Sequence, residues 1–175
     1  RRWDVLPQQP AIAYDIAQNR LIVTAAALQG PIFAEAATPA EKFGAFGGLV
    51  AHEVSRAIDA KGAMIDARGE LRSWWTPADK SAWTLLGNRV AAQYGGYAFP
   101  GVKDAKVNGE LTRDENLADI SGVEIAWEAF STSPQGTAAS AADKQAFFKG
   151  WAGLWAQQLS PNEALQRLAT DVRAP

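Results

Sequence analysis

Three residues of one predicted helix, His52, Glu53 and Arg56, have types and spacing that could do metal chemistry. In the pattern H-E-x-x-H, two imidazoles four residues apart share a helix face and hold one Zn²⁺, while the glutamate is a general base. The stretch 44–59, GAFGGLVAHEVSRAID, has the first histidine and the glutamate, but Arg56 stands at the second histidine position. A guanidinium has no lone pair for a metal and stays protonated. The spacing therefore indicates a zinc motif that lacks one ligand.

A second acidic pair, Glu115 and Asp119, lies in the sequence ENLAD. Residues four apart on a helix share one face, so these two carboxylates are expected to point the same way. His52 is the only histidine of the chain, and there is no cysteine. A metal site would therefore be built from His52 and carboxylates, unless another chain contributed ligands.

The composition fits one compact domain with a substantial core. The chain has 175 residues, of which 47% are apolar, and it contains seven tryptophans. The net charge of -2 comes from interspersed acidic and basic residues, which does not favour a nucleic-acid surface. No apolar run is long enough to span a bilayer, and the opening RRWDVLPQQP lacks the apolar stretch of a signal peptide.

The elements expected to position these residues are mostly helices. Thr38-Pro39-x-Glu41 and Thr76-Pro77-x-Asp79 each combine a capping residue, a first-turn proline and an acidic third residue. They predict helices over 39–59, with a possible break at one of the glycines near its start, and over 77–93. Thr112 is expected to cap a helix that continues to residue 130. Further helices are predicted over 143–159 and from 161 onward.

The remaining segments are expected to be irregular or extended. Residues 1–37 read as a lead-in with an edge strand, because 11–14 and 21–24 have the short, β-branched character of strands. Residues 131–142 are rich in Ser, Thr, Pro, Gly and Ala, which is typical of a mobile linker. The pairs Trp74-Trp75 and Trp151/Trp155 are interpreted as core residues in preference to a ligand platform.

Two long stretches resemble the catalytic half of the neprilysin family of zinc metallopeptidases, which includes the endothelin-converting enzymes. They are 44–79, GAFGGLVAHEVSRAIDAKGAMIDARGELRSWWTPAD, and 107–130, VNGELTRDENLADISGVEIAWEAF. The similarity extends upstream to Ile22-Val23 and downstream to Thr170-Asp171-Val172, so it spans nearly the whole chain. The resemblance implies a mainly α (α+β), zincin-type catalytic domain over 1–175 with a few short strands.

The resemblance also implies roles for individual residues. The metal ligands of the family fall on His52 and Glu115, its general base falls on Glu53, and a supporting acid falls on Asp119. A further supporting carboxylate of the family is retained as Asp59. The second histidine ligand falls on Arg56, where the match fails.

Other departures from the family pattern affect the substrate cleft. The family has an asparagine that holds the substrate backbone, and that position is Ile12, followed by the retained Ala13. The histidine that helps to stabilise the transition state in the family falls on Arg173. The long helical domain that precedes this half in family members lies outside this sequence.

These departures suggest a pseudo-peptidase, which has lost zinc hydrolysis and acts as a binding or assembly subunit. In this interpretation the guanidinium of Arg56 forms a salt bridge to Asp59 or Glu115 in place of the metal, and no cofactor is expected. The partner would be another protein chain, either the missing helical domain or a related peptidase subunit, and a peptide is a further candidate.

Two other interpretations remain open. One is an active zinc metalloendopeptidase with an atypical ligand set, in which case zinc is the cofactor. The other is a helical module with a purely structural role. The resemblance implies export to a periplasmic or extracellular location.

Overall fold

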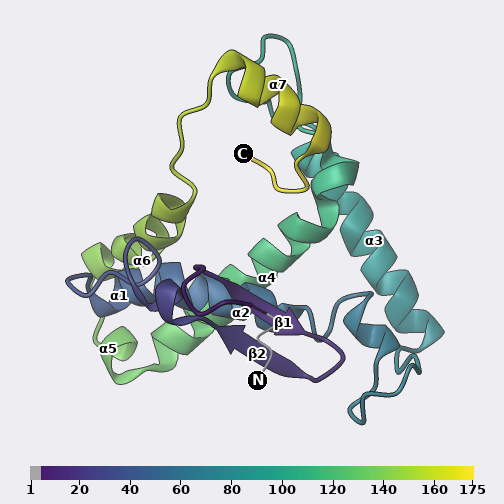
Figure 1. Ribbon diagram of the computed structural model, residues 1–175, viewed down its shortest axis with the longest axis horizontal. Coiled ribbons are helices and arrows are strands. Elements are labelled where there is room, and N and C mark those ends of the chain that lie inside the picture. Colours follow the sequence, from purple (N-terminus) through teal and green to yellow (C-terminus); the bar gives the residue numbers. More distant parts are fainter. Residues whose placement is uncertain (1–4) are drawn as a thin grey trace. The chain divides into compact units, whose positions relative to one another are not determined.

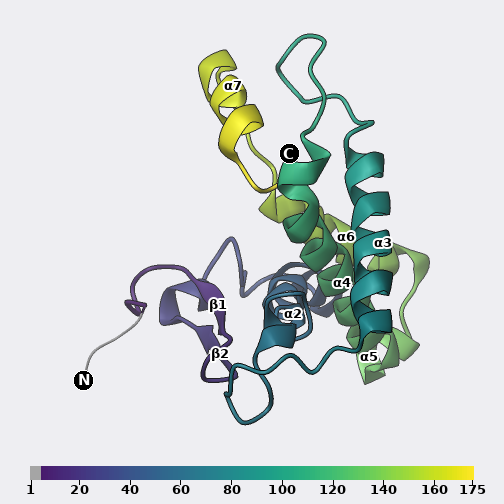
Figure 2. The same cartoon turned by 90° about the vertical axis from the view of Figure 1, so that its right-hand side faces the viewer.

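The structure, a computed structural model, describes residues 5–175 (Figures 1 and 2). The expected lead-in begins with residues 1–4, which lie outside the described part of the chain. The internal contacts divide the protein into two compact units. Unit 1 contains the chain up to Trp74 together with Asp119–Ala156, and unit 2 contains Trp75–Ala118 together with Gln157–Pro175.

Unit 1 begins with an antiparallel hairpin of two strands, β1 (Ile12–Asp15) and β2 (Arg20–Val23). Tyr14 pairs with Leu21 across the hairpin, and the turn uses a positive φ of 46° at Asn19, a residue type that tolerates it. A 3₁₀ turn, η1 (Ala25–Leu28), follows. The hairpin lies beside helix α2 in both views, with β1 as the neighbouring strand (Figures 1 and 2).

The helical segment that carries His52 contains a π-helical turn. Helix α1 (Pro39–Lys42), the π turn η2 (Phe43–Gly47) and helix α2 (Gly48–Ser55) follow one another without a gap. Gly44 lies against the backbone of Phe147, where any Cβ would collide, and Gly48 lies against the ring of Trp151. The glycines therefore permit helix α6 (Ala141–Leu154) to pack closely on this segment.

The end of α2 differs from the prediction. The helix was expected to reach Asp59, but it ends at Ser55. The Asp59 carboxylate accepts hydrogen bonds from the N–H groups of Lys61 and Gly62, both at 2.8 Å. This turn redirects the backbone, and it leads into the 3₁₀ turn η3 (Gly62–Met64).

The core of unit 1 lies where α1, α2 and the second half of helix α4 (Gly109–Thr132) meet α6. Phe130 and Phe147 are fully buried in it, among Ala40, Ala51 and Ala126. The segment 131–142, expected to be a linker, contains the end of α4, the short helix α5 (Pro134–Thr137) and the start of α6. It is thus a short helical connection, and its mobility stays a prediction.

Unit 2 contains α3 (Pro77–Tyr94), the first part of α4 and α7 (Pro161–Thr170), around a small core of Phe99, Val107 and Ala164. The start of α4 is earlier than predicted. Asn108 caps it by accepting the N–H of Leu111, whereas the Thr112 hydroxyl donates to the Asn108 carbonyl. Gly109 lies against the Ala91 backbone, so α3 and the start of α4 run side by side (Figure 2).

The interpretation of Trp74 as a core residue is wrong, because Trp74 is 48% exposed and lines a cavity. Among residues 5–175, no helix has both the length and the apolar character that crossing a membrane requires.

Candidate functional site

His52 lies inside unit 1 and is only 1% exposed. Its Nδ1 lies 2.6 Å from Oδ1 of Asp119, which α4 supplies. One turn further along α4, a Cβ on Gly122 would lie 2.8 Å from the His52 backbone nitrogen, closer than real Cβ atoms approach. The glycine therefore allows α4 to approach α2 closely enough for Asp119 to reach the imidazole.

The other imidazole nitrogen of His52 contacts an arginine. Arg56 Nη2 lies 3.2 Å from His52 Nε2. A guanidinium only donates hydrogen bonds, so Nε2 must be the acceptor and the proton of the neutral imidazole must be on Nδ1, where it is donated to Asp119. A zinc-binding histidine uses the same tautomer, with a carboxylate on one nitrogen and the metal on the other. Here the guanidinium N–H uses the lone pair that a metal would need.

The Arg56 guanidinium also faces a carboxylate of the following turn. Its Nη1 lies 3.6 Å from Asp59 Oδ2, and the two side chains are only 16% and 13% exposed. Asp59 is fixed by the two backbone N–H groups that its other oxygen accepts. Asp119, His52 and Arg56 are thus linked by two hydrogen bonds, and an ion pair extends the chain from Arg56 to Asp59.

Glu53, the predicted general base, lies between His52 and the hairpin. Its Oε1 is 3.8 Å from His52 Nε2, and its Oε2 accepts the backbone N–H of Tyr14 in β1 at 3.1 Å. The same strand carries the predicted cleft residues Ile12 and Ala13, which pair with Val23 and Ile22. Ile12 has no side-chain amide, which the asparagine implied at this position by the family resemblance would have.

Two predicted site residues, Glu115 and Arg173, belong to unit 2 and form an ion pair there. Arg173 Nη2 lies 3.2 Å from Glu115 Oε2, and the Arg173 backbone N–H donates to Asp171. Glu115 and Asp119 both lie on α4, and the expectation that their carboxylates point the same way stays a prediction. Among residues 5–175, no three His, Asp or Glu side chains group as a metal-binding cluster would.

The sequence did not predict two contacts of the candidate site. The role of Gly122 could have been suspected, because a glycine inside a helix often marks a close helix contact. The hydrogen bond from Tyr14 to Glu53 uses a backbone N–H, which every residue except proline carries, so no side-chain pattern could have indicated it.

The comparisons with known proteins identify the family. The sequence profile of Peptidase family M13 matches residues 12–175. Neutral endopeptidase from Lactococcus lactis is 30% identical over 173 residues, covering 99% of this chain and 26% of that protein. Endothelin-converting enzyme 1 from Homo sapiens is 29% identical over 181 residues, covering 99% of this chain and 23% of that protein.

A solved structure agrees with these sequence matches. The zinc metalloprotease Zmp1 of Mycobacterium tuberculosis, in its open state, matches with a TM-score of 0.90 at 32% identity, over 99% of this chain and 28% of that one. The mainly helical fold expected from the sequence is thereby confirmed. This chain spans about a quarter of the length of the relatives it matches. On this evidence the chain belongs to Peptidase family M13, the neprilysin family of zinc metallopeptidases.

Proposed function

We propose that this neprilysin-family peptidase domain does not hydrolyse peptides through zinc and acts instead as a binding or assembly subunit. The observation that carries the proposal is the contact of Arg56 Nη2 with His52 Nε2 at 3.2 Å. A catalytic zinc ion needs three protein ligands and an open fourth position. The only imidazole of the chain already offers its available lone pair to a permanent cation. The residues around His52 therefore do not fit the metal.

The charges support the same proposal. Arg56 faces Asp59 in unit 1, and Arg173 faces Glu115 in unit 2. Both arginines stand at positions where the family resemblance places histidines, and both carboxylates are ones that the family uses in or near its metal site. The two arginines thus neutralise carboxylates that a divalent cation would otherwise neutralise. This exchange favours a stable metal-free domain.

The remaining parts of the proposal concern partners and location. The chain corresponds to about a quarter of its relatives, and the rest of such a protein, or a related peptidase subunit, would supply the surfaces that complete a peptide cleft. We expect the partner to be a protein chain, with a peptide as the further candidate. Export to a periplasmic or extracellular location is part of the proposal, on family grounds.

The test is a cleavage assay on the purified chain, with a library of short peptides and zinc added in excess. The proposal predicts that wild type and Glu53→Gln give the same background, because no metal-activated water exists for Glu53 to deprotonate. Cleavage by wild type that Glu53→Gln abolishes would establish the alternative, an active zinc endopeptidase with an atypical ligand set. Co-purification of a stable second chain would distinguish an assembly subunit from a purely structural module.

A reversion extends this test to the metal. Arg56→His should gain zinc binding, since it restores a second imidazole four residues after His52. Hydrolysis should stay low even so, because Ile12 and Arg173 still replace residues that the family uses for substrate and transition state. Arg89→His, which adds a histidine on the exposed face of α3, is the matched control and should gain no zinc.

A further inference from the structure

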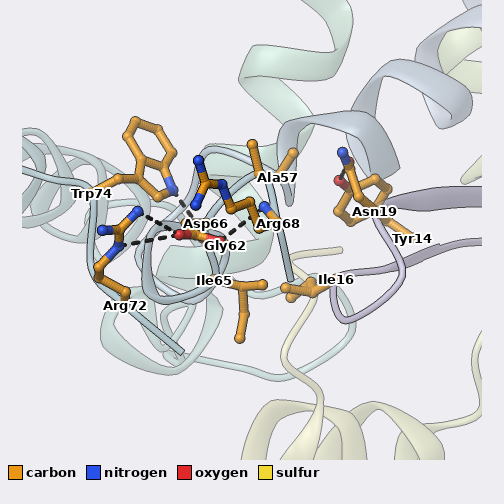
Figure 3. A pocket seen from close by; sticks show the side chains of 11 residues that line it. Tyr14, Ile16, Asn19, Ala57, Gly62, Ile65, Asp66, Arg68, Arg72 and Trp74 are labelled. Carbon is orange, nitrogen blue, oxygen red and sulfur yellow. Dashed lines mark hydrogen bonds and ion pairs between the residues drawn. The ribbon is translucent and has the colours of Figure 1, made fainter. Parts of the chain in front are cut away.

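A cavity of about 430 Å³ opens in unit 1 between the hairpin turn and the loop that follows α2 (Figure 3). This volume lies in the range of small-molecule sites, which are mostly apolar with a few placed polar groups. The lining comes from two separate stretches of the chain, around residues 14–19 and 57–74.

The walls of the cavity are largely apolar. Ile16 lines it from the hairpin turn, Ala57 and Ile65 line it from the loop after α2, and Trp74 lines it from the end of that loop (Figure 3). The indole of Trp74 is held in place, because its Nε1–H donates to the carbonyl of Gly62 at 3.3 Å. A fixed aromatic surface that is half exposed provides contact area at little entropic cost.

The one acidic group in the lining, Asp66, is fully engaged. Its Oδ1 accepts the N–H groups of Arg68 and Glu70 at 2.9 and 3.1 Å, and its Oδ2 accepts Nε and Nη2 of Arg72 at 3.1 and 2.7 Å. These backbone hydrogen bonds, with the arginine, hold the pKa of the Asp66 carboxyl below its usual range. Asp66 and Arg72 therefore neutralise each other and fix the loop.

Arg68 is the remaining charge of the lining. Its backbone N–H is bonded to Asp66, but within residues 5–175 its guanidinium makes no hydrogen bond or ion pair. Figure 3 shows its side chain among the residues that line the cavity. The cavity thus combines an apolar wall, a fixed indole and one uncompensated guanidinium, which is suited to a planar anion.

We propose that this cavity binds an organic carboxylate joined to an aromatic or branched apolar group. The guanidinium of Arg68 holds the carboxylate, and the apolar group lies against Ile65 and the indole of Trp74. The chemistry is shared by free aromatic acids and by the carboxyl end of a peptide whose last residue is apolar. Binding here needs neither zinc nor hydrolysis, so this proposal does not depend on whether zinc binds at His52.

The experiment is calorimetric titration of the chain with two probes, 3-phenylpropionate and N-acetyl-alanyl-phenylalanine, and with the neutral amide of each. At least one acid should bind saturably, and its amide should bind at least tenfold more weakly. Arg68→Gln should weaken the acid at least tenfold, while Arg68→Lys should recover part of the loss and Arg89→Gln, an exposed arginine of α3, should have no effect. In ¹⁵N spectra the indole N–H of Trp74 should shift on binding.

The outcomes separate the two sources of the ligand. Binding of 3-phenylpropionate alone supports a site for free acids, and tighter binding of the acetylated dipeptide supports a peptide carboxyl end. The proposal is overturned by the absence of saturable binding of either acid at millimolar concentration. Amides that bind as tightly as the acids, or an Arg68→Gln protein that binds like wild type, would overturn it equally.

Discussion

Arg56 is the residue on which the interpretation of the site depends, because it contacts both the imidazole of His52 and the carboxylate of Asp59. Arg56→Ala leaves Nε2 of the buried His52 without its donor and removes the ion-pair partner of Asp59. Removing one partner of such a contact costs more than the contact itself contributes. We expect a loss of about 1–3 kcal/mol in the free energy of unfolding, measured by urea denaturation. The exposed Arg89→Ala should change it by less than about 0.5 kcal/mol, and an equal effect of both would contradict the account.

Gly122 is the second residue with a sharp prediction, because it sets the distance between α4 and α2. Gly122→Ala inserts a Cβ at 2.8 Å from the His52 nitrogen, against backbone that cannot move aside. We expect destabilisation of about 1–3 kcal/mol, as for other overpacking changes, and a shifted imidazole resonance of His52. Gly153→Ala is the matched control in α6, where a Cβ meets nothing within 4 Å. There alanine should be neutral or slightly stabilising, so a milder effect at Gly122 than at Gly153 would refute the packing argument.

Among the elements, four helices start with the same reciprocal cap. The acidic third residue accepts hydrogen bonds from its cap, which lowers the pKa of that carboxyl; the residues are Glu41, Asp79, Asp143 and Glu163. A carboxyl whose pKa is lower in the folded state stabilises the fold above its unfolded pKa, and that contribution is lost as pH falls through the folded value. Stability should therefore decrease once the pH drops below about 4, the ordinary range of carboxyls.

A single substitution isolates this effect at α3. Asp79→Asn removes the titrating group whose pKa is lowered, first of all, by the hydroxyl of Thr76. The variant should be less stable than wild type at neutral pH, and the difference should shrink as the pH falls below the carboxyl range. Thermal unfolding across pH 2–7 measures it. Asp104→Asn, in an exposed loop, is the control; a constant difference between Asp79→Asn and wild type at all pH values would show that the cap does not titrate.

The elements also show what the sequence could predict. A helix start is signalled by nearby residues, a cap and an acidic third residue, and Thr38 and Thr76 cap their helices as predicted. Boundaries set by distant contacts were predicted less well. The choice of Asn108 over Thr112 at the start of α4 goes with the packing of Gly109 on Ala91, which no local pattern contains.

The candidate site likewise has a part that the sequence predicts and a part that it does not. The spacing of His52, Glu53 and Asp119 relative to the family pattern was enough to anticipate that they lie in one region of unit 1. The cavity beside Trp74 could not be anticipated, because exposure of that tryptophan depends on how the loop after α2 folds back. The charge of the cavity lining depends on which arginine pairs with Asp66, and the sequence does not distinguish Arg68 from Arg72 as that partner.

At the scale of the whole molecule, the chain corresponds to about a quarter of its relatives and consists of two compact units. Each unit has its own small core, and in each an arginine pairs with a carboxylate that the family resemblance places in or near the metal site. This arrangement supports the proposal that the domain keeps its fold without zinc chemistry. What the domain binds is then a question of partner chains and of the cavity in unit 1.

The most direct test of this account is a zinc titration followed on the single imidazole of the chain. Because His52 is the only histidine, its two ring nitrogens can be observed without ambiguity by ¹⁵N NMR. The account predicts a neutral imidazole protonated on Nδ1, unchanged by equimolar zinc in wild type, and a metal-induced shift of Nε2 in Arg56→His. Stoichiometric zinc on wild-type His52, with its Nε2 resonance shifted, would contradict the central claim.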